Sequence, residues 1–129
     1  MSNAKKMDLV FIKDDKSMFD LGTEMFKTLF DKVEIVRDTN KALKFISRNP
    51  YHIVISDISV DPIDRITFVK QIKQLKPELI VAALVAPKDE GKIGGLIETG
   101  VHSFVLDPKQ LDQALEVIAQ MKPDKKREA

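Results

Sequence analysis

The sequence contains no cysteine, which removes disulfides, thiolate nucleophiles and cysteine-ligated zinc or iron–sulfur clusters from the options for this chain. Tryptophan is also absent and tyrosine occurs once, so there is no aromatic platform on which nucleic-acid bases could stack. The longest uninterrupted apolar run, residues 79–86, is far shorter than the ~20 residues needed to cross a bilayer. The sequence therefore excludes disulfide-stapled, metal-thiolate and membrane-spanning classes of protein.

An excess of charge of either sign is missing too. Lysine and arginine total 21 against 20 acidic residues, for a net charge of +1, which argues against general binding to nucleic acids or anionic membranes. With 129 residues, of which 43% are hydrophobic and 32% charged, the chain is predicted to form one folded domain. We assign this domain to residues 7–122, with 1–6 as an N-terminal extension or tag remnant and 123–129 as a charged tail. The lack of cysteine and of a visible signal peptide predicts a cytoplasmic location.

Two hydrophobic periodicities alternate along the chain. Short apolar runs rich in valine, isoleucine and phenylalanine predict strands, at residues 9–12, 33–36, 53–55, 79–85 and 104–106. Apolar residues at helical spacing predict helices between and after them, within residues 18–30, 42–46, 66–72 and 111–118. A further helix is expected between the last two strands. It is the poorest of the set, because Gly91, Gly94 and Gly95 each cost up to ~1 kcal/mol relative to alanine.

Regular alternation of strands and helices predicts an α/β fold, because right-handed crossovers place the strands in a parallel sheet covered on both faces. The runs at 9–12, 53–55 and 79–85 are almost continuously apolar, as central parallel strands are. The run at 33–36 carries Glu34 and is expected at an edge of the sheet.

Acidic residues follow three of the predicted strands. Asp14 and Asp15 come after the first strand, Asp57 after the third and Asp107 after the fifth. In an open α/β sheet, ligands bind outside the carboxyl ends of the strands, so these residues are the candidates for chemistry. Carboxylates held close together repel unless a cation or a proton neutralises them. Oxygen ligands without cysteine or histidine suit Mg²⁺.

The two histidines are not candidates for this site. His52 and His102 come at the starts of the third and fifth predicted strands, at the opposite end of the sheet from the acids. We interpret them as structural or surface residues. No glycine-rich phosphate loop is present either, because Gly94 and Gly95 match neither nucleotide-binding pattern.

Across residues 7–122 the chain resembles a response-regulator receiver domain of two-component signalling. Four features occur in order at family-like spacing and carry this resemblance: the acid pair Asp14–Asp15, the strand end Val54-Ile55-Ser56-Asp57, the segment Glu98-Thr99-Gly100-Val101 before Ser103-Phe104-Val105, and Pro108 at the last helix. The resemblance implies a flavodoxin-like three-layer sandwich with strand order 2-1-3-4-5.

The resemblance also implies roles for individual residues. Asp57 would accept a phosphoryl group from a histidine kinase, and Asp14, Asp15 and Asp57 would hold Mg²⁺ together with the main-chain carbonyl of Ser59. Phe104 occupies the position of the family's switch aromatic. A cis peptide bond before Pro108 is implied as well.

Three departures from the family pattern affect the same site. Ala86 stands where the family has a switch threonine or serine, and Asp107 stands where it has a lysine. The loop after the acceptor has its proline one place late, and Arg65 replaces a glycine. The hydroxyl and the cation that would hold a phosphoryl group are therefore both missing.

Each acidic residue also has a structural interpretation. Asp57 could cap the turn after its strand, and Asp14 and Asp15 could be acids before a helix N-terminus. Asp107-Pro108-Lys109-Gln110 reads as positions N-cap to N3 of a helix, with Gln110 placed to reach back as in a capping box. For Asp107, the capping role and a role in the site stay equally open.

The sequence thus predicts a receiver-type signalling domain, not an enzyme, with Asp57 as phosphoacceptor and phosphorylation impaired by Ala86 and Asp107. The alternative is a phosphorylation-independent pseudo-receiver that acts as a protein-interaction or dimerisation module. A Mg²⁺-dependent phosphatase is a third option, but the Asp-x-Asp motif of such enzymes is broken by Ser59. The expected partners are a histidine kinase or another signalling protein, or a second copy of the chain, and neither nucleic acid nor a membrane.

Overall fold

The protein is described from a computed structural model, in which the described residues are 7–13, 23–58 and 62–121. Five strands form one sheet in the order β2-β1-β3-β4-β5, and every neighbouring pair is parallel. The predicted α/β fold and strand order are confirmed. The strands are β1 (Leu9–Ile12), β2 (Val33–Val36), β3 (Ile53–Asp57), β4 (Ile80–Val85) and β5 (His102–Val105).

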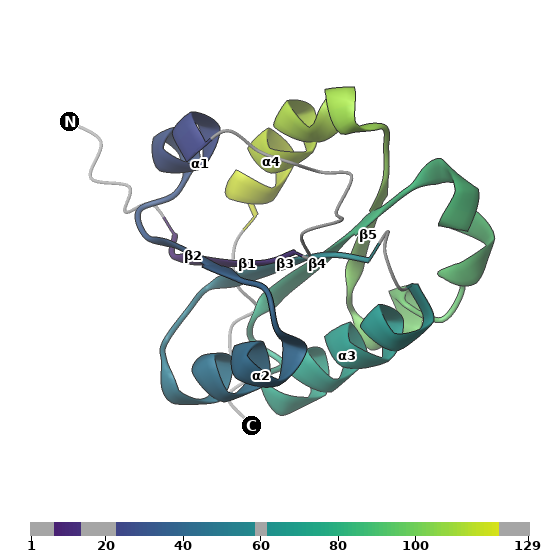
Figure 1. Cartoon of the computed structure of the whole chain (residues 1–129), viewed down its shortest axis with the longest axis horizontal. Helices are drawn as coiled ribbons and strands as arrows, with labels where there is room; N and C mark the ends of the chain where they lie inside the picture. The colour runs from purple at the N-terminus through teal and green to yellow at the C-terminus, as the bar shows by residue number, and fades with distance from the viewer. Residues whose placement is uncertain (1–6, 14–22, 59–61, 122–129) are drawn as a thin grey trace.

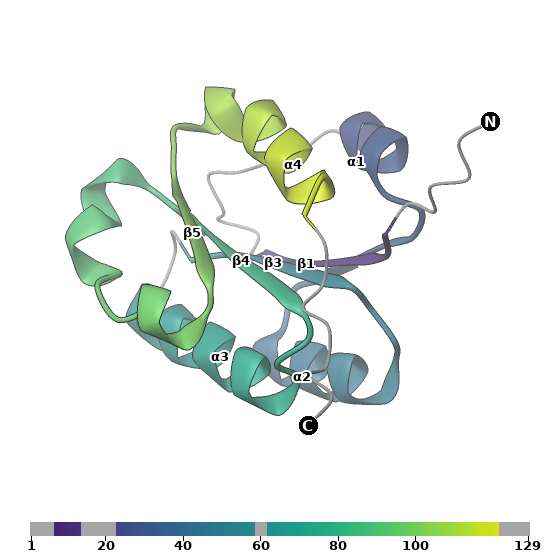
Figure 2. The same cartoon turned by 180° about the vertical axis from the view of Figure 1, so that it is seen from behind.

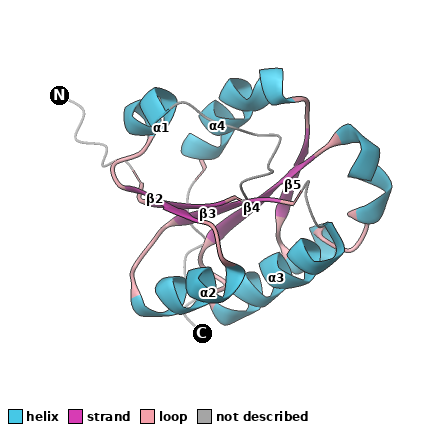
Figure 3. Ribbon diagram, viewed as in Figure 1, coloured by secondary structure: helices cyan, strands magenta, loops and turns pink. Residues whose placement is uncertain are grey.

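Helices cover both faces of this sheet, so that the domain has three layers, with the sheet in the middle. α2 (Thr39–Arg48) and α3 (Pro62–Leu75) lie on one face, while α1 (Thr23–Leu29) and α4 (Leu111–Ala119) lie on the other (Figures 1 and 2). No helix among the described residues is long and apolar enough to cross a membrane. Figure 3 shows the strands as the middle layer between the helices, and all neighbouring strands are parallel. The carboxyl ends of the strands therefore share one edge of the sheet.

The core consists of two apolar layers separated by the sheet. Successive residues of β1, β3 and β4 alternate between the layers, because strand side chains point to opposite faces, and every residue of these strands is buried. One layer joins the sheet to α2 and α3 through Ala42, Ile46, Val69 and Ile72. The other joins it to α1 and α4 through Phe26, Phe30, Leu115 and Ile118. The helices predicted within residues 42–46, 66–72 and 111–118 are thereby confirmed, and the described part of the one predicted within 18–30 is helical from Thr23.

α2 begins before the apolar run at 42–46 from which it was predicted. Asp38 is its N-cap residue: the carboxylate accepts hydrogen bonds from the amides of Asn40 at 2.8 Å and Lys41 at 3.3 Å. Aspartate is among the strongest N-cap residues, and its extended backbone leaves Thr39 free to enter the first turn.

The connection between β4 and β5 differs from the prediction. An α-helix was expected there, but the chain forms two short 3₁₀ helices, Pro87–Lys92 (η1) and Ile97–Thr99 (η2). Glycine is a poor residue for a helix interior, and Gly94 and Gly95 fall between the two turns. Gly100 then adopts a φ of +84°, a conformation that glycine reaches without steric cost.

The amino end of the sheet is held by polar contacts to main-chain groups. Nδ1 of His52 accepts a hydrogen bond from the amide of Asp8 at 3.0 Å, which confirms a structural role for this histidine away from the acids. The ammonium of Lys73, on the buried face of α3, donates to the carbonyls of Pro77 and Leu79, both at 2.7 Å. Each contact satisfies groups that would otherwise lose hydrogen bonds on burial.

Replacing Lys73 with methionine should lower the free energy of unfolding by about 1–3 kcal/mol, because two carbonyls would lose a charged donor while the apolar stem is kept. Urea denaturation followed by circular dichroism measures this change. The matched control is Lys44→Met, an exposed lysine on α2, which should change stability by less than ~0.5 kcal/mol. Equal losses in both variants would show that the two hydrogen bonds contribute nothing.

Tyr51 lies at the same end of the sheet, and its environment disfavours the tyrosinate. Burial raises the pKa of the phenol above its usual 10.0, and the charges of Glu34 and Asp8 raise it further. Because the folded state holds the phenol proton more tightly than the unfolded state, the contribution of Tyr51 to the free energy of unfolding is fully present below pH ~10. It is lost as the pH rises through the folded-state pKa. Because Tyr51 is the only tyrosine and tryptophan is absent, the ultraviolet absorbance of the tyrosinate reports this group alone. Glu34→Gln should shift the titration toward lower pH, whereas Glu116→Gln on α4 should leave it unchanged.

Candidate functional site

Asp57 is the last residue of β3, at the carboxyl edge of the sheet. It lies opposite Leu84 of β4, and the next amide, of Ile58, donates to the Leu84 carbonyl at 3.1 Å. The strand is therefore paired up to the residue that precedes the loop. Asp57 is only 1% exposed, so its carboxylate sits in the rim of the core rather than in a free turn. This placement matches the position predicted for the acceptor.

The proposed partners of Asp57 in a metal site lie outside the described residues. Asp14 and Asp15 follow β1, and Ser59 follows β3 by two residues. β1 pairs directly with β3, with Ile12 opposite Ser56, so both loops leave the sheet from neighbouring strands about 5 Å apart. Within the described ranges, no group of three metal-ligating side chains occurs. The convergence of the three aspartates stays a prediction, supported by strand order.

Ala86 follows β4 directly and is buried, with 1% exposed. Its carbonyl accepts a hydrogen bond from the amide of Asp89 at 2.9 Å, which starts η1. The methyl group offers no hydrogen bond, so this position packs against its neighbours and cannot grip an anion through its side chain. Ala86 thus lies at the end of β4, the strand next to that of Asp57, and its replacement of a switch hydroxyl stays a prediction.

Asp107 lies two residues beyond β5 and is exposed. Its amide donates to Oε1 of Gln110 at 2.9 Å, and the amide of Gln110 donates to the carbonyl of Asp107 at 2.9 Å. The first of these bonds is half of a capping box, in which the side chain at N3 reaches back to the N-cap amide. Pro108–Gln110 forms a 3₁₀ turn (η3) that leads into α4. These bonds place Asp107 at the start of η3, while the N-cap residue of α4 itself is Gln110; a role of Asp107 in the site stays a prediction.

The peptide bond between Asp107 and Pro108 does not have the form that the resemblance implied. Among the described residues no peptide bond is cis, so the expectation of a cis bond before Pro108 is wrong for this structure.

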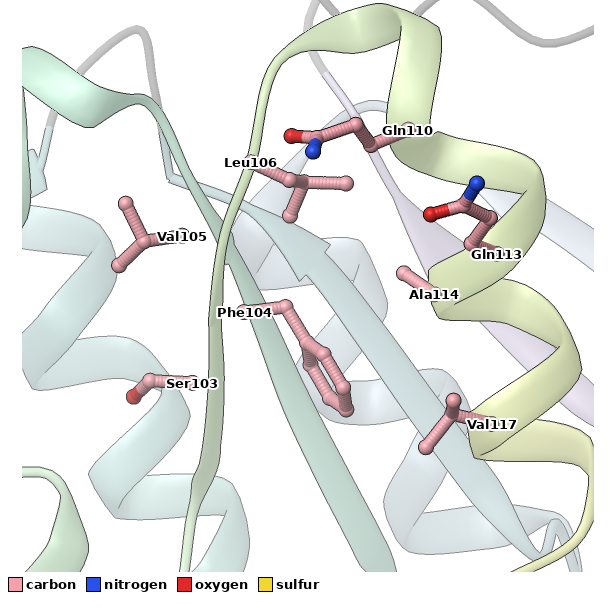
Figure 4. Close-up of a pocket in the computed structure, with 8 residues that line it drawn as sticks. All are labelled: Ser103, Phe104, Val105, Leu106, Gln110, Gln113, Ala114 and Val117. Carbon is pink, nitrogen blue, oxygen red and sulfur yellow. The ribbon is translucent and has the colours of Figure 1, made fainter.

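Phe104 lies in the middle of β5, with its half-buried ring on the α4 side of the sheet. It pairs with Leu84 across the sheet, two residues before Ala86. Its ring borders a groove of about 380 Å³ between β5 and α4, together with Leu106, Ala114 and Val117 (Figure 4). In Figure 4, Ser103 and Val105 point to the other side of the strand. The ring thus lines the β5–α4 groove and lies in the same cross-strand row as Leu84 and Asp57.

Asp89 was given no role by sequence analysis, yet it is only 2% exposed. Its Oδ1 pairs with the ammonium of Lys92 at 3.1 Å, and its Oδ2 is buried without a hydrogen-bond partner in the described part of the chain. Arg65, noted as a replacement for glycine, is also buried, on the face of α3 that carries Val69. No periodicity marks either residue as buried, since charged residues in loops and first turns are usually exposed.

A parallel α/β sandwich with a buried aspartate at the carboxyl end of its central strand is the architecture of a signalling receiver. The response regulator receiver domain family model matches residues 9–119. The chain belongs to this family.

Similarity to individual proteins agrees with the family match. The chain is 25% identical over 114 residues to the chemotaxis protein CheY of Bacillus subtilis strain 168, covering 84% of this chain and 92% of that protein. The receiver domain of NtrC4 from Aquifex aeolicus superimposes with a TM-score of 0.71 at 17% identity, covering 87% and 93% of the two chains. The receiver domain of sensor histidine kinase PA1611 from Pseudomonas aeruginosa PAO1, solved with a magnesium ion in its active site cleft, gives 0.66 at 16% identity, covering 90% and 99%.

Removing the Gln110 side chain should destabilise the start of α4. Gln110→Ala deletes the acceptor of the Asp107 amide, and loss of a capping interaction costs about 0.5–1 kcal/mol. Thermal unfolding measures the effect, and Gln110→Glu, which keeps the acceptor, should restore most of it. Gln113→Ala, exposed on the next turn of α4, serves as control. A loss of similar size in Gln113→Ala would assign the effect to the helix surface and not to the cap.

Proposed function

We propose that this receiver domain accepts a phosphoryl group on Asp57, with Mg²⁺ held by Asp14, Asp15, Asp57 and the main-chain carbonyl of Ser59, and that it holds this group weakly. The observation that carries the proposal is the place of Asp57: buried, on a central strand, at the carboxyl edge of the sheet. The oxygen-only donor set suits Mg²⁺. The partner that fits is a histidine kinase or another signalling protein, and we expect no catalytic turnover of a separate substrate.

In the transfer step, an oxygen of the Asp57 carboxylate forms a bond to phosphorus while the bond to the donor nitrogen or oxygen breaks. The product is an acyl phosphate that carries two negative charges in place of one. Bound Mg²⁺ would supply positive charge against this increase. A phosphatase reading fits less well, because its nucleophile belongs on the first strand and Asp57 lies on the third.

Two missing contacts explain why the phosphoryl group would be held weakly. Ala86 cannot donate the hydrogen bond that a threonine or serine would give. At position 107 the chain has an exposed carboxylate where a lysine ammonium would attract the phosphoryl oxygens. A unit-charge pair at ~4 Å is worth about 4 kcal/mol at an effective dielectric of ~20, and solvent exposure reduces this considerably. The loss of attraction therefore outweighs the added repulsion from Asp107, whose side chain lies in solvent.

The second candidate function is a phosphorylation-independent interaction module. One observation favours it: Val117, 52% exposed, and the half-buried ring of Phe104 border the open groove between β5 and α4. Exposed apolar side chains around a groove are typical of protein-interaction sites. A homodimer through this groove is the simplest form of such a module.

Intact-mass measurement after incubation with Mg²⁺ and acetyl phosphate tests the first function. We expect a low yield of one phosphoryl adduct, which is absent in Asp57→Ala. The double variant Ala86→Thr/Asp107→Lys should raise the yield about 5–30-fold, since restored contacts worth ~1–2 kcal/mol change an equilibrium by that factor.

The outcome that contradicts the proposal is the absence of an adduct in both the native chain and the double variant. Sedimentation equilibrium then tests the second candidate, for which Val117→Asp should dissociate a dimer that the native chain forms. A monomer in both proteins would contradict the homodimer.

A further inference from the structure

The outer side of β2 is an open edge of the sheet. The carbonyls of Lys32 and Val36 accept hydrogen bonds from the amides of Leu9 and Lys13, at 2.7 and 3.1 Å. Because main-chain groups alternate sides along a strand, the amides and carbonyls of residues 33 and 35 face away from β1. No strand lies beyond β2 in the sheet of the described residues. β2 therefore presents main-chain donors and acceptors to an incoming strand.

A groove of about 360 Å³ runs beside this edge, between β2 and α2. Its apolar part consists of Val36 and Phe45. Ile35, 42% exposed, borders the groove along the strand, but its register with Phe11 places its side chain on the face of the sheet opposite α2. Its polar part consists of Glu34, Arg37, Asp38 and Lys41. The groove and the open edge are adjacent, so one extended segment could use both.

On the α2 side the groove is lined by Lys41 and Phe45, and basic residues continue along the helix beyond it. Lys41, Phe45 and Arg48 are spaced at i, i+4 and i+7, which places them on one stripe of the helix. Lys44 lies beside this stripe, and α2 carries no acidic residue. Lys41, Lys44 and Arg48 are exposed, and within the described part of the chain none of them forms an ion pair.

No acidic residue of α2 neutralises these three cations. Lys44 and Arg48 are four residues apart, a spacing at which like charges destabilise a helix. Of the acids near the groove, Asp38 uses its carboxylate to cap α2, which leaves Glu34 as the acid opposite the basic stripe. By contrast α4, on the other face of the sheet, has Asp112 and Glu116 and no basic residue. α2 is therefore a basic helix, whereas α4 is an acidic one.

We propose that the β2–α2 groove binds an extended acidic segment of a partner protein, which pairs with β2 as an additional parallel or antiparallel strand. Alternating side chains of such a segment would face the basic stripe of α2 on one side and Ile35 on the other. Main-chain hydrogen bonds to residues 33 and 35 would fix its position, and the cations would select for acidic residues.

Other occupants fit these features less well. A nucleic acid would use the cations but neither the open strand edge nor the apolar floor, and the described groove residues include no exposed aromatic ring for base stacking. A membrane surface would need apolar side chains on the outer face of α2, where the exposed residues are Asn40, Lys41, Lys44, Ser47 and Arg48. A second copy could offer α4, but α4 is helical and cannot pair with a strand edge.

The probe for the test is an eight-residue peptide of alternating glutamate and valine with blocked ends. Titration of the ¹⁵N-labelled domain should perturb amides within residues 32–37 and 41–48 and leave those of α4 unchanged. Raising the salt concentration should weaken binding, because exposed charges are screened. A peptide in which lysine replaces glutamate should not bind.

Two variants separate the charge from the strand edge. Lys41→Gln/Arg48→Gln should weaken binding about fivefold to tenfold, whereas Lys27→Gln/Lys109→Gln, with the same loss of charge at exposed positions elsewhere, should bind like the native chain. Ile35→Pro removes the outward amide and keeps the bonds of Glu34 and Val36 with β1, because proline is tolerated on the open side of an edge strand. In this variant the peptide should no longer slow hydrogen exchange of the β2 amides. Its circular dichroism spectrum should match that of the native chain.

Three results would overturn the proposal. The first is equal affinity of the native chain and Lys41→Gln/Arg48→Gln for the peptide. The second is tighter binding of a single-stranded oligonucleotide than of the peptide at the same salt concentration. The third is salt-dependent self-association, removed by Asp112→Asn/Glu116→Gln, which would make a second copy the occupant.

Discussion

Burial of β1, β3 and β4 on both faces is the constraint on which the rest of this structure depends. Their side chains are fully packed between two helical layers, so each crossover has to return over the sheet, and all strands run in one direction. The loops that follow β1, β3, β4 and β5 then share one edge. Asp57, at the end of the most central strand, therefore lies at the rim of the core, and the packing of the sheet alone is enough to hold it there.

The packing of the central strands fixes the surroundings of Asp57, whereas it leaves the residues at other strand ends open to substitution. The frame around Asp57 is intact: the strand is paired up to its last residue and the carboxylate is buried. At two other strand ends the chain has a buried methyl group at Ala86 and a solvent-facing residue at Asp107, at the positions where the receiver resemblance implies a hydroxyl and a lysine. A fold can tolerate such changes because they touch loop ends and leave the packed layers unaltered.

Much of this fold follows from the sequence, because apolar periodicity reports burial directly. The strands at 9–12 and 33–36 match their predicted bounds, while β3 continues to Asp57 and β5 begins at His102, two residues earlier than predicted. The residues that the prediction left out of these strands are polar, and hydropathy does not indicate that a polar residue is paired in a sheet. Between β4 and β5 the sequence predicted a helix, the poorest of the set, and the chain forms two 3₁₀ turns with Gly94 and Gly95 between them. The free-energy cost of glycine in a helix interior accounts for this difference. The burial of Asp89 and Arg65, and the cap at Asp38, depend on tertiary and main-chain contacts that no single-residue pattern contains. Family resemblance located Asp57 and the replaced positions, while the arrangement of Asp14, Asp15 and Ser59 around it is still a prediction.

The pair of 3₁₀ turns between β4 and β5 gives the domain an uneven distribution of local stability. Short 3₁₀ segments lack the cooperative ladder of an α-helix, and among the described side chains of η1 and the residues up to η2, Leu96 and Asp89 are the ones that the core buries. Opening this connection exposes far less apolar surface than opening β3 or α3, so its hydrogen-exchange free energy lies below that of global unfolding. The segment forms a unit that can unfold and refold while the central strands stay paired. An event at the carboxyl edge next to Ala86 can thus change the population of this open state without changing the stability of the core.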